Sequence, residues 1–211
     1  MGVSVNAMKI HWQKTVSGVV GFSRLGRDYW RSLANNINDP KTLAQLTQRA
    51  RITTVAKFLH TLAPVWQQGY NHLKGNGRSA HNLIFQQVLN NALSGNLNDG
   101  FTVDPTKVLI SRGPLTSAYI ISATVAPTTQ TVTVSWNNNS GAGTALASDK
   151  ISIFVYNATK DINAYAPSTA QRSDESATLT YNTSWSGNTI YVYAFFSDSN
   201  ADSHCLGFFT A

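Results

Sequence analysis

The feature that most constrains the fold is a change in hydrophobic periodicity near residue 100. Before this point, apolar residues recur at intervals of three and four, as on one face of an α-helix. After it, apolar and polar residues alternate in short β-branched segments separated by turn-rich stretches such as 137–143. The chain therefore combines a helical part with an all-β part, and the predicted fold class is α+β.

The helical part is predicted to be an α-helical hairpin. Asp39 is a suitable N-cap and Pro40 a suitable first residue for the first helix. Pro64 is expected to kink this helix, or to end it and start another. Ser79 is expected to cap the second helix, and Gly95 suits the position just after it. Such a hairpin has an apolar face that needs a partner.

The all-β part is predicted to be an immunoglobulin-like or fibronectin-like sandwich, because about seven short strands follow one another over roughly 105 residues. The segments are 107–111, 118–122, 131–136, 150–156, 177–181, 189–196 and 205–209. The first of them belongs either to the sandwich or to a linker before it. Trp136 ends an alternating strand and is predicted to lie in the core, whereas the turn residue Trp185 is left open.

The N-terminal residues are basic, aromatic and interrupted by glycine. Residues 19–22 indicate a short strand, and Tyr29 with Trp30 indicates a second, with Gly26 between them. The predicted organisation is then an arm or hairpin at 1–38, a helical hairpin at 39–100, a linker or first strand at 101–112 and a sandwich at 113–211. We expect the sandwich to fold alone and residues 1–112 to drive assembly.

Charge is distributed unevenly between the two halves. Residues 1–112 contain thirteen Lys and Arg against four Asp, a net charge of +9, whereas residues 113–211 contain three basic and six acidic residues, a net charge of −3. This asymmetry favours an anionic partner for the first half and solvent for the second.

The candidate contact residues are the cations of the first half and the aromatic residues between them. They are Lys14, Arg24, Arg27, Tyr29, Trp30, Arg31, Lys41, Arg49, Arg51 and Lys57. Such a set suits either a protein interface or phosphate contacts with base stacking. Arg49 and Arg51 point about 160° apart on a helical wheel, which favours the protein interface.

No pattern in the sequence indicates catalysis or metal binding. The acidic residues include one glutamate, Glu175, and the five histidines form no H-E-x-x-H motif. The lone cysteine, Cys205, excludes an internal disulfide framework and a cysteine zinc site. The G-x-G-x-x-A match at 75–80 follows a helix rather than a strand. We therefore predict a non-enzymatic protein without cofactor or metal. No secretory signal or membrane-spanning run is recognisable, so we expect folding in a cytoplasm and no membrane partner.

Several segments also resemble a known family. They are GVVGFSRLGRDYWRS at 18–32, NDPKTLAQLTQRAR at 38–51, QQGY at 67–70, NNALSGN at 90–96, KVLISRGPL at 107–115 and VSWNNNSG at 134–141. Together they are similar to a domain-of-unknown-function family of Bacteroidota and their phages, whose pattern is a V-V-G turn, an aromatic-Arg-Ser and N-P-x-T-x-x-Q-x-x-Q-R. The matching residues are Val19, Val20, Gly21, Arg31, Ser32, Pro40, Thr42, Gln45, Gln48 and Arg49. The chain departs from the pattern at 24–26 and at Asp39. The resemblance implies architecture and source, and it assigns no activity.

The leading hypothesis is a non-enzymatic structural protein of a bacteriophage virion, such as a capsid accessory, connector or tail part. Its basic helical half is expected to dock on neighbouring subunits or on itself in an oligomer, with the sandwich displayed; assembly would take place in the bacterial cytoplasm. The first alternative is a nucleic-acid-binding protein that uses the basic arm. The second is a glycan-binding sandwich, with Trp136 and Trp185 as a stacking platform.

Overall fold

The computed structural model describes most of the chain. The described residues are 15–16, 18–24, 27–33, 39–73, 78–118, 121–126, 129–181, 185, 187–198 and 208–210. The chain divides into two compact units, Met1–Thr42 and Leu43–Ala211, and each is described by itself. The division thus falls within four residues of the predicted end of the arm, and the helices share a unit with the sandwich.

The first unit contains a small antiparallel sheet. Its strands are β1 (Thr15–Val16), β2 (Val19–Arg24) and β3 (Arg27–Ser32), in the order β1-β2-β3. Gly18 supplies the positive φ, 79°, at the turn between β1 and β2. The predicted hairpin is confirmed, with β1 added at its edge.

The second unit begins with the helices. They are α1 (Leu43–Thr61), α2 (Ala63–Gly69), the 3₁₀ turn η1 (Asn71–Leu73) and α3 (Ala80–Asn91). Pro64 stands in the first turn of α2, as predicted, and the backbone N–H of Asn82 donates to the Ser79 hydroxyl at the start of α3. The start expected at Asp39 is wrong, because Lys41 has a φ of 49° and α1 begins only after it.

A second small hairpin, which the sequence analysis did not predict, follows α3. Its strands are β4 (Leu93–Asn96) and β5 (Gly100–Val103). The Asn96 side chain forms the turn by accepting hydrogen bonds from the backbone N–H groups of Asn98 and Asp99, both at 2.9 Å. Gly95 therefore lies in a strand, and the expectation that it follows the helix end is wrong: Ala92 is the C-cap.

Seven strands in two antiparallel sheets form the sandwich. They are β6 (Ile121–Ala126), β7 (Thr131–Trp136), β8 (Lys150–Asn157), β9 (Ile162–Gln171), β10 (Ser176–Thr180), β11 (Ile190–Ser197) and β12 (Phe208–Thr210). The sheet orders are β10-β7-β6 and β12-β11-β8-β9. The fold is α+β with an immunoglobulin-like, fibronectin-like sandwich, as predicted. Strand β9 was missed, and the predicted strand at 107–111 is instead the 3₁₀ turn η2 (Pro105–Lys107) and an extended segment.

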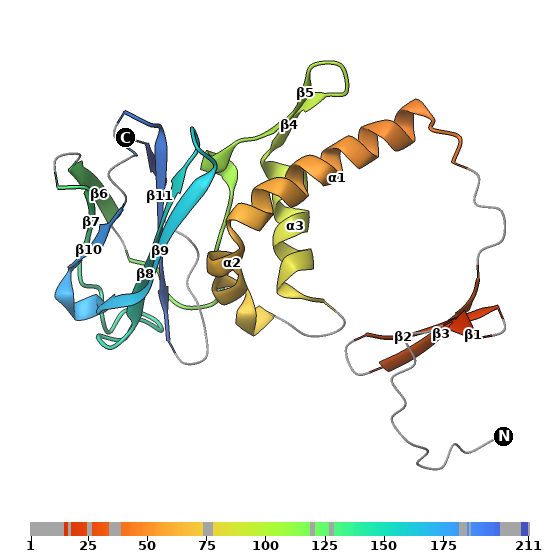
Figure 1. Ribbon diagram of the computed structural model, residues 1–211. Coiled ribbons are helices and arrows are strands. Elements are labelled where there is room, and N and C mark those ends of the chain that lie inside the picture. The colour runs from red at the N-terminus through yellow and green to blue at the C-terminus, as the bar shows by residue number, and fades with distance from the viewer. Residues whose placement is uncertain are drawn as a thin grey trace, which may run out of the picture. The chain divides into compact units, whose positions relative to one another are not determined.

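The four-stranded sheet lies between the three-stranded sheet and the helices (Figure 1). On β8, Ile153 and Val155 pack into the sandwich core, whereas Phe154 packs against the helices. Strand β11 alternates in the same way, with Val192 in the sandwich core and Tyr193 under the helices. The second unit is therefore a three-layer structure with two cores.

The segment predicted as a linker or first strand, 101–112, contributes to the helix-side core. Val108 and Ile110 are buried with the helices and the sheet. The Tyr193 hydroxyl donates to the carbonyl of Pro105 at 2.8 Å. The backbone of this segment passes so close to Gly69 that an added Cβ would lie 2.8 Å from the Cα of Ser111. The helices, this segment and the sandwich are thus packed as one body.

Candidate interaction surfaces

The cations and aromatic residues predicted for the N-terminal arm gather on one sheet. Phe22 pairs with Tyr29 across β2 and β3, and their rings stack with centroids 5.4 Å apart. Arg31 pairs with Val20, and Arg24 pairs with Arg27, each pair two positions along the strands from the stacked rings. Residues two positions apart share a face of a strand. One face of the sheet thus combines a stacked aromatic pair with Arg31.

The opposite face of this sheet carries Trp30, which is the most exposed aromatic side chain described, at 63%. Val19 lies on the same face and is also exposed. Gly21 is buried, but no described side chain of the first unit is buried. A three-stranded sheet is stable when one face packs on another layer. Both faces of this sheet therefore present contact area for a partner.

The remaining candidate residues lie elsewhere. Arg49, Arg51 and Lys57 are on α1, in the second unit, and Lys41 is in the segment before that helix. Arg51 is half-buried and donates to the side chain of Gln48 at 3.5 Å. Lys14 lies outside the described residues. The structure thus brings together the described candidates of the arm, whereas Arg49, Arg51 and Lys57 belong to a helix of the other unit.

A groove between α1 and the β4–β5 hairpin was not anticipated, because the hairpin itself was not predicted. Its volume is about 500 Å³. Leu43, Thr47 and Arg51 line one side, on successive turns of α1, and Leu93 and Phe101 of the hairpin line the other. Leu43 is 71% exposed. We call this feature the α1 groove; apolar and polar side chains line it together, and Arg51 is its charged lining residue.

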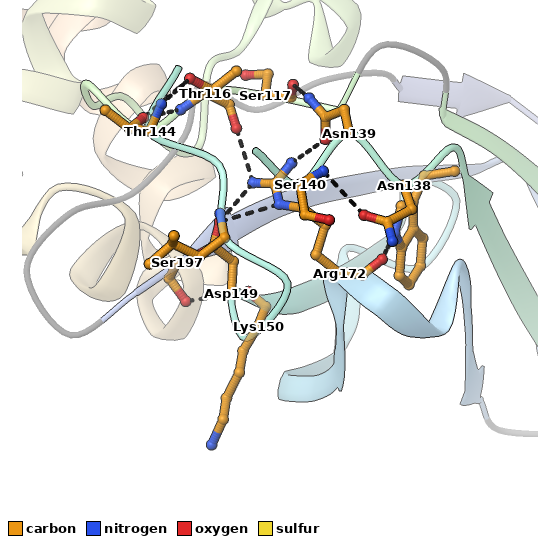
Figure 2. A network of polar contacts seen from close by, with 12 residues as sticks. Thr116, Ser117, Asn138, Asn139, Ser140, Thr144, Asp149, Lys150, Arg172 and Ser197 are labelled. Carbon is orange, nitrogen blue, oxygen red and sulfur yellow. Dashed lines mark hydrogen bonds and ion pairs between the residues drawn. The ribbon is translucent and has the colours of Figure 1, made fainter. Parts of the chain in front are cut away.

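A second feature missed by the sequence analysis is a buried ion pair at one end of the sandwich (Figure 2). The guanidinium of Arg172, in the 3₁₀ turn η3 (Arg172–Asp174), lies 3.0 Å from the carboxylate of Asp149, and both side chains are fully buried. Arg172 also donates to the Asn139 side chain at 2.6 Å and to the carbonyl of Thr116 at 2.8 Å. Burial lowers the pKa of Arg172, and the Asp149 carboxylate opposes that shift. The network ties two segments to η3, the one before β6 that contains Thr116 and the β7–β8 loop that contains Asn139 and Asp149.

The two tryptophans considered for glycan stacking are both buried. Trp136 is in the sandwich core, as predicted, and its indole N–H donates to the carbonyl of Arg172. Trp185 is 4% exposed and stacks on Tyr181 with centroids 5.4 Å apart. These two rings therefore form no exposed platform, which is a correction to the glycan-binding alternative.

The described part of the chain shows neither a metal-binding cluster nor a membrane-spanning helix. No group of three or more His, Cys, Asp or Glu residues is placed there to hold a metal ion. No described helix is long and apolar enough to cross a membrane. Cys205 and residues 74–77 of the glycine-containing loop lie outside the described residues.

Comparison with known proteins shows the family of the chain. Among solved structures, it is similar to the fn3 domain of human contactin 1, with 11% identity over 48% of this chain and 79% of that domain and a TM-score of 0.37. It is also similar to the FN1–FN3 domains of chicken CNTN1, with 11% identity over 56% of this chain and 34% of that one and a TM-score of 0.34. None of the curated proteins matches significantly. A family model matches residues 10–205, and the chain belongs to the family of unknown function DUF6266.

Proposed function

We propose that the chain is a non-enzymatic structural protein that assembles with other proteins and with copies of itself. In its specific form, the proposal is a component of a bacteriophage particle of Bacteroidota, such as a capsid accessory, connector or tail part. The chain is made in the cytoplasm of the host and ends in the virion. The basic helical half, together with the N-terminal sheet, docks on neighbouring subunits, and the sandwich is displayed.

The N-terminal sheet is the observation that carries this proposal. It is a compact unit of its own and exposes Phe22, Tyr29 and Trp30, which are residue types enriched at the centres of protein interfaces. Each aromatic ring buried at an interface removes a large apolar area from water, and burial of apolar area stabilises the complex by roughly 25 cal/mol per Å². A partner that covers this sheet gains that burial and supplies the layer that the sheet lacks.

The sandwich is built to remain separate from other sheets. Edge strand β9 contains Pro167, which has no backbone N–H to offer to a neighbouring strand. Ser168 follows with a φ of 50°, at a register irregularity between β8 and β9. Both features discourage strand addition at this edge. An edge strand that discourages pairing is expected of a sandwich that is displayed while the arm makes the contacts.

The test is whether the chain becomes part of a particle. Particles are purified on density gradients from cultures of the bacterium that carries the gene, and the chain is detected by mass spectrometry. We expect it in the particle fractions, and we expect the triple variant Phe22→Ser, Tyr29→Ser, Trp30→Ser to be lost from them. Ile162→Ser, an exposed apolar residue of β9, is the matched control. Recovery of the chain only in particle-free fractions would contradict the proposal.

A specific observation keeps nucleic-acid binding as the second candidate. Arg31 shares a face of the sheet with the stacked pair, and Arg24 and Arg27 are paired in the backbone register at the other end of the same two strands; cations beside aromatic rings suit phosphate contacts and base stacking. Neutralising all three arginines should then lower the salt dependence of DNA binding by up to about 3 units of slope. The measurement is DNA retention against salt concentration. No retention at low salt would eliminate this candidate.

A further inference from the structure

The chemistry of the α1 groove indicates what would fill it. Leu43, Leu93 and Phe101 give part of it an apolar surface, polar side chains such as Thr47 and Asn98 line the rest, and Arg51 adds a positive charge at one side. The complement is an exposed apolar side chain that stands beside negative charge.

An exposed apolar side chain beside negative charge is found at the far end of the same unit. Leu146 is 56% exposed, and its neighbour Ala147 accepts a hydrogen bond from the backbone N–H of Ser173 in η3. Asp174 and Glu175 come next in the chain and are exposed. We call Leu146, Asp174 and Glu175 the acidic knob.

The buried network of Arg172 holds the knob in place (Figure 2). One carboxylate oxygen of Asp149 binds the guanidinium of Arg172 at 3.0 Å and accepts a hydrogen bond from the backbone N–H of Leu146 at 2.9 Å. The backbone N–H of Arg172 donates to the Asp149 carbonyl at 2.7 Å. Asp149 thus joins the Leu146 loop to η3, so the apolar side chain and the two acids form a fixed arrangement. Fixed contact groups lose little conformational entropy on binding.

The parts of the chain that contain the two features differ in net charge. Residues 43–112, which include the groove, carry seven Lys and Arg against two Asp, whereas residues 113–211, which include the knob, carry three basic and six acidic residues. Within one copy the two features cannot meet, since η3 and the hairpin β4–β5 lie at opposite ends of the unit (Figure 1). The partner that each requires is therefore another molecule.

We propose that the acidic knob of one copy docks in the α1 groove of the next, which gives a head-to-tail contact between copies of this chain. The inference rests on the proposed function, because it names one contact of the assembly. Leu146 enters the apolar part of the groove, and Glu175 faces Arg51 of the neighbouring copy. A contact between two different surfaces repeats from copy to copy, and it closes into a ring or continues as a filament.

The experiment measures self-association of the full chain by sedimentation velocity. We expect oligomers that grow with protein concentration and that weaken when salt rises from about 0.1 M to about 1 M, which shortens the Debye length from about 10 Å to about 3 Å. Arg51→Glu alone and Glu175→Lys alone should each weaken association by about tenfold, because each turns an attraction into a repulsion. The double variant restores opposite charges and should recover the affinity to within about threefold.

Two matched controls accompany these variants. Lys57→Glu makes the same charge change on an exposed position of α1 outside the groove lining, and Ile162→Ser matches Leu146→Ser on the sandwich. Circular dichroism shows whether each variant is folded. Loss of association in Leu146→Ser but not in Ile162→Ser supports the inference.

Three results would overturn it: a full chain that stays monomeric up to about 1 mM, the weak end of specific affinities; equal effects of Arg51→Glu and Lys57→Glu; or a double variant no better than the single ones. Association that depends on Trp30 and ignores Arg51 and Glu175 would also overturn it, while leaving the proposed function intact.

Discussion

Two of the antiparallel sheets in the described part of the chain differ in how they are covered. The sheet of β8 and β11 is buried on both faces, under the helices on one side and the three-stranded sheet on the other. The sheet of β2 and β3 is exposed on both faces, although it carries aromatic side chains of the same kinds. Tyr193 is completely buried, whereas Tyr29 is 43% exposed.

The difference shows which part of the molecule supplies stability and which part is available for contacts. A sheet gains stability from the layers packed on it, because the hydrophobic effect scales with the apolar area removed from water. Strands β8 and β11 receive those layers from their own chain. Strands β2 and β3 receive none among the described residues of their unit, so their apolar area stays exposed.

The largest expected effect comes from removing one layer of the covered sheet. A fragment of residues 43–211 should melt cooperatively, because it contains both cores. A fragment of residues 113–211 leaves Phe154, Tyr193 and Phe195 without the helices that cover them. We expect this fragment to aggregate or to lose its cooperative transition.

Thermal melting and light scattering on the two fragments check this prediction. The strand pattern of the sequence predicts the opposite result, a sandwich that folds alone, so the experiment decides between the two. A monomeric 113–211 fragment that melts as cooperatively as 43–211 would show that the sandwich core is sufficient and that the helix layer is an accessory.

The next largest effect concerns the buried ion pair in the covered part of the chain. Arg172→Met should lower the free energy of unfolding by about 3–5 kcal/mol, because it leaves the Asp149 carboxylate buried without its countercharge. Adding Asp149→Asn should recover part of this loss. Chemical denaturation measures both, with exposed Arg112→Met as the control. A loss no greater than that of the control would mean that the pair adds nothing to stability.

Part of the architecture of the second unit was predicted from the sequence. Another part was indicated by a sequence pattern but was not predicted. The alternation at 131–136 predicted a strand with one buried face, and Trp136 is buried as that pattern requires. The segments at 150–156 and 189–196 are instead almost continuously apolar, which indicates strands buried on both faces. That pattern could have predicted a third layer over the sandwich.

Other parts of the fold depend on contacts that local patterns do not contain. Strand β9, with sequence INAYAPSTAQ, includes a proline and several small residues, so its propensity is weak and its pairing with β8 determines its structure. The position of Lys41 in left-handed backbone overrode the cap signal of Asp39. The N-terminal hairpin was predicted because its strands are adjacent in sequence, whereas the α1 groove requires the packing of a helix against a distant hairpin.

A smaller effect is expected at the closest approach between the helices and the buried segment. Gly69→Ala should lower the free energy of unfolding by about 1–3 kcal/mol, because the new Cβ meets the backbone of Ile110 and Ser111. The backbone atoms of Ile110 and Ser111 can make room for this Cβ only if the whole segment 101–112 shifts. Thermal denaturation measures the effect, with exposed Gln67→Ala of the same helix as the control. If Gly69→Ala leaves the free energy of unfolding unchanged, α2 is loosely packed against the segment 101–112.

The pH dependence of stability tests a smaller contribution from the same segment, 101–112. Hydrogen bonds from Thr106, together with the nearby Lys107, hold the pKa of Asp104 below its ordinary value. A carboxylate with a lowered pKa in the folded state stabilises the fold above its unfolded pKa, and this contribution is lost as pH falls through the folded pKa. Asp104→Asn should therefore reduce the melting temperature at pH 6 more than at pH 2–3. An equal reduction at both pH values would contradict this assignment.

The smallest expected effect on stability is in the exposed sheet, and it completes the comparison. Trp30→Ala removes the most exposed aromatic side chain described, so the melting transition of the second unit should change by no more than about 0.5 kcal/mol. Phe154→Ala, a completely buried residue of β8, should cost about 3–5 kcal/mol in the same measurement. The two substitutions remove aromatic rings, and they differ in whether the chain itself covers the ring. If Trp30→Ala destabilises the second unit nearly as much as Phe154→Ala does, the arm contributes to the fold of the second unit and its aromatic surface is not reserved for a partner.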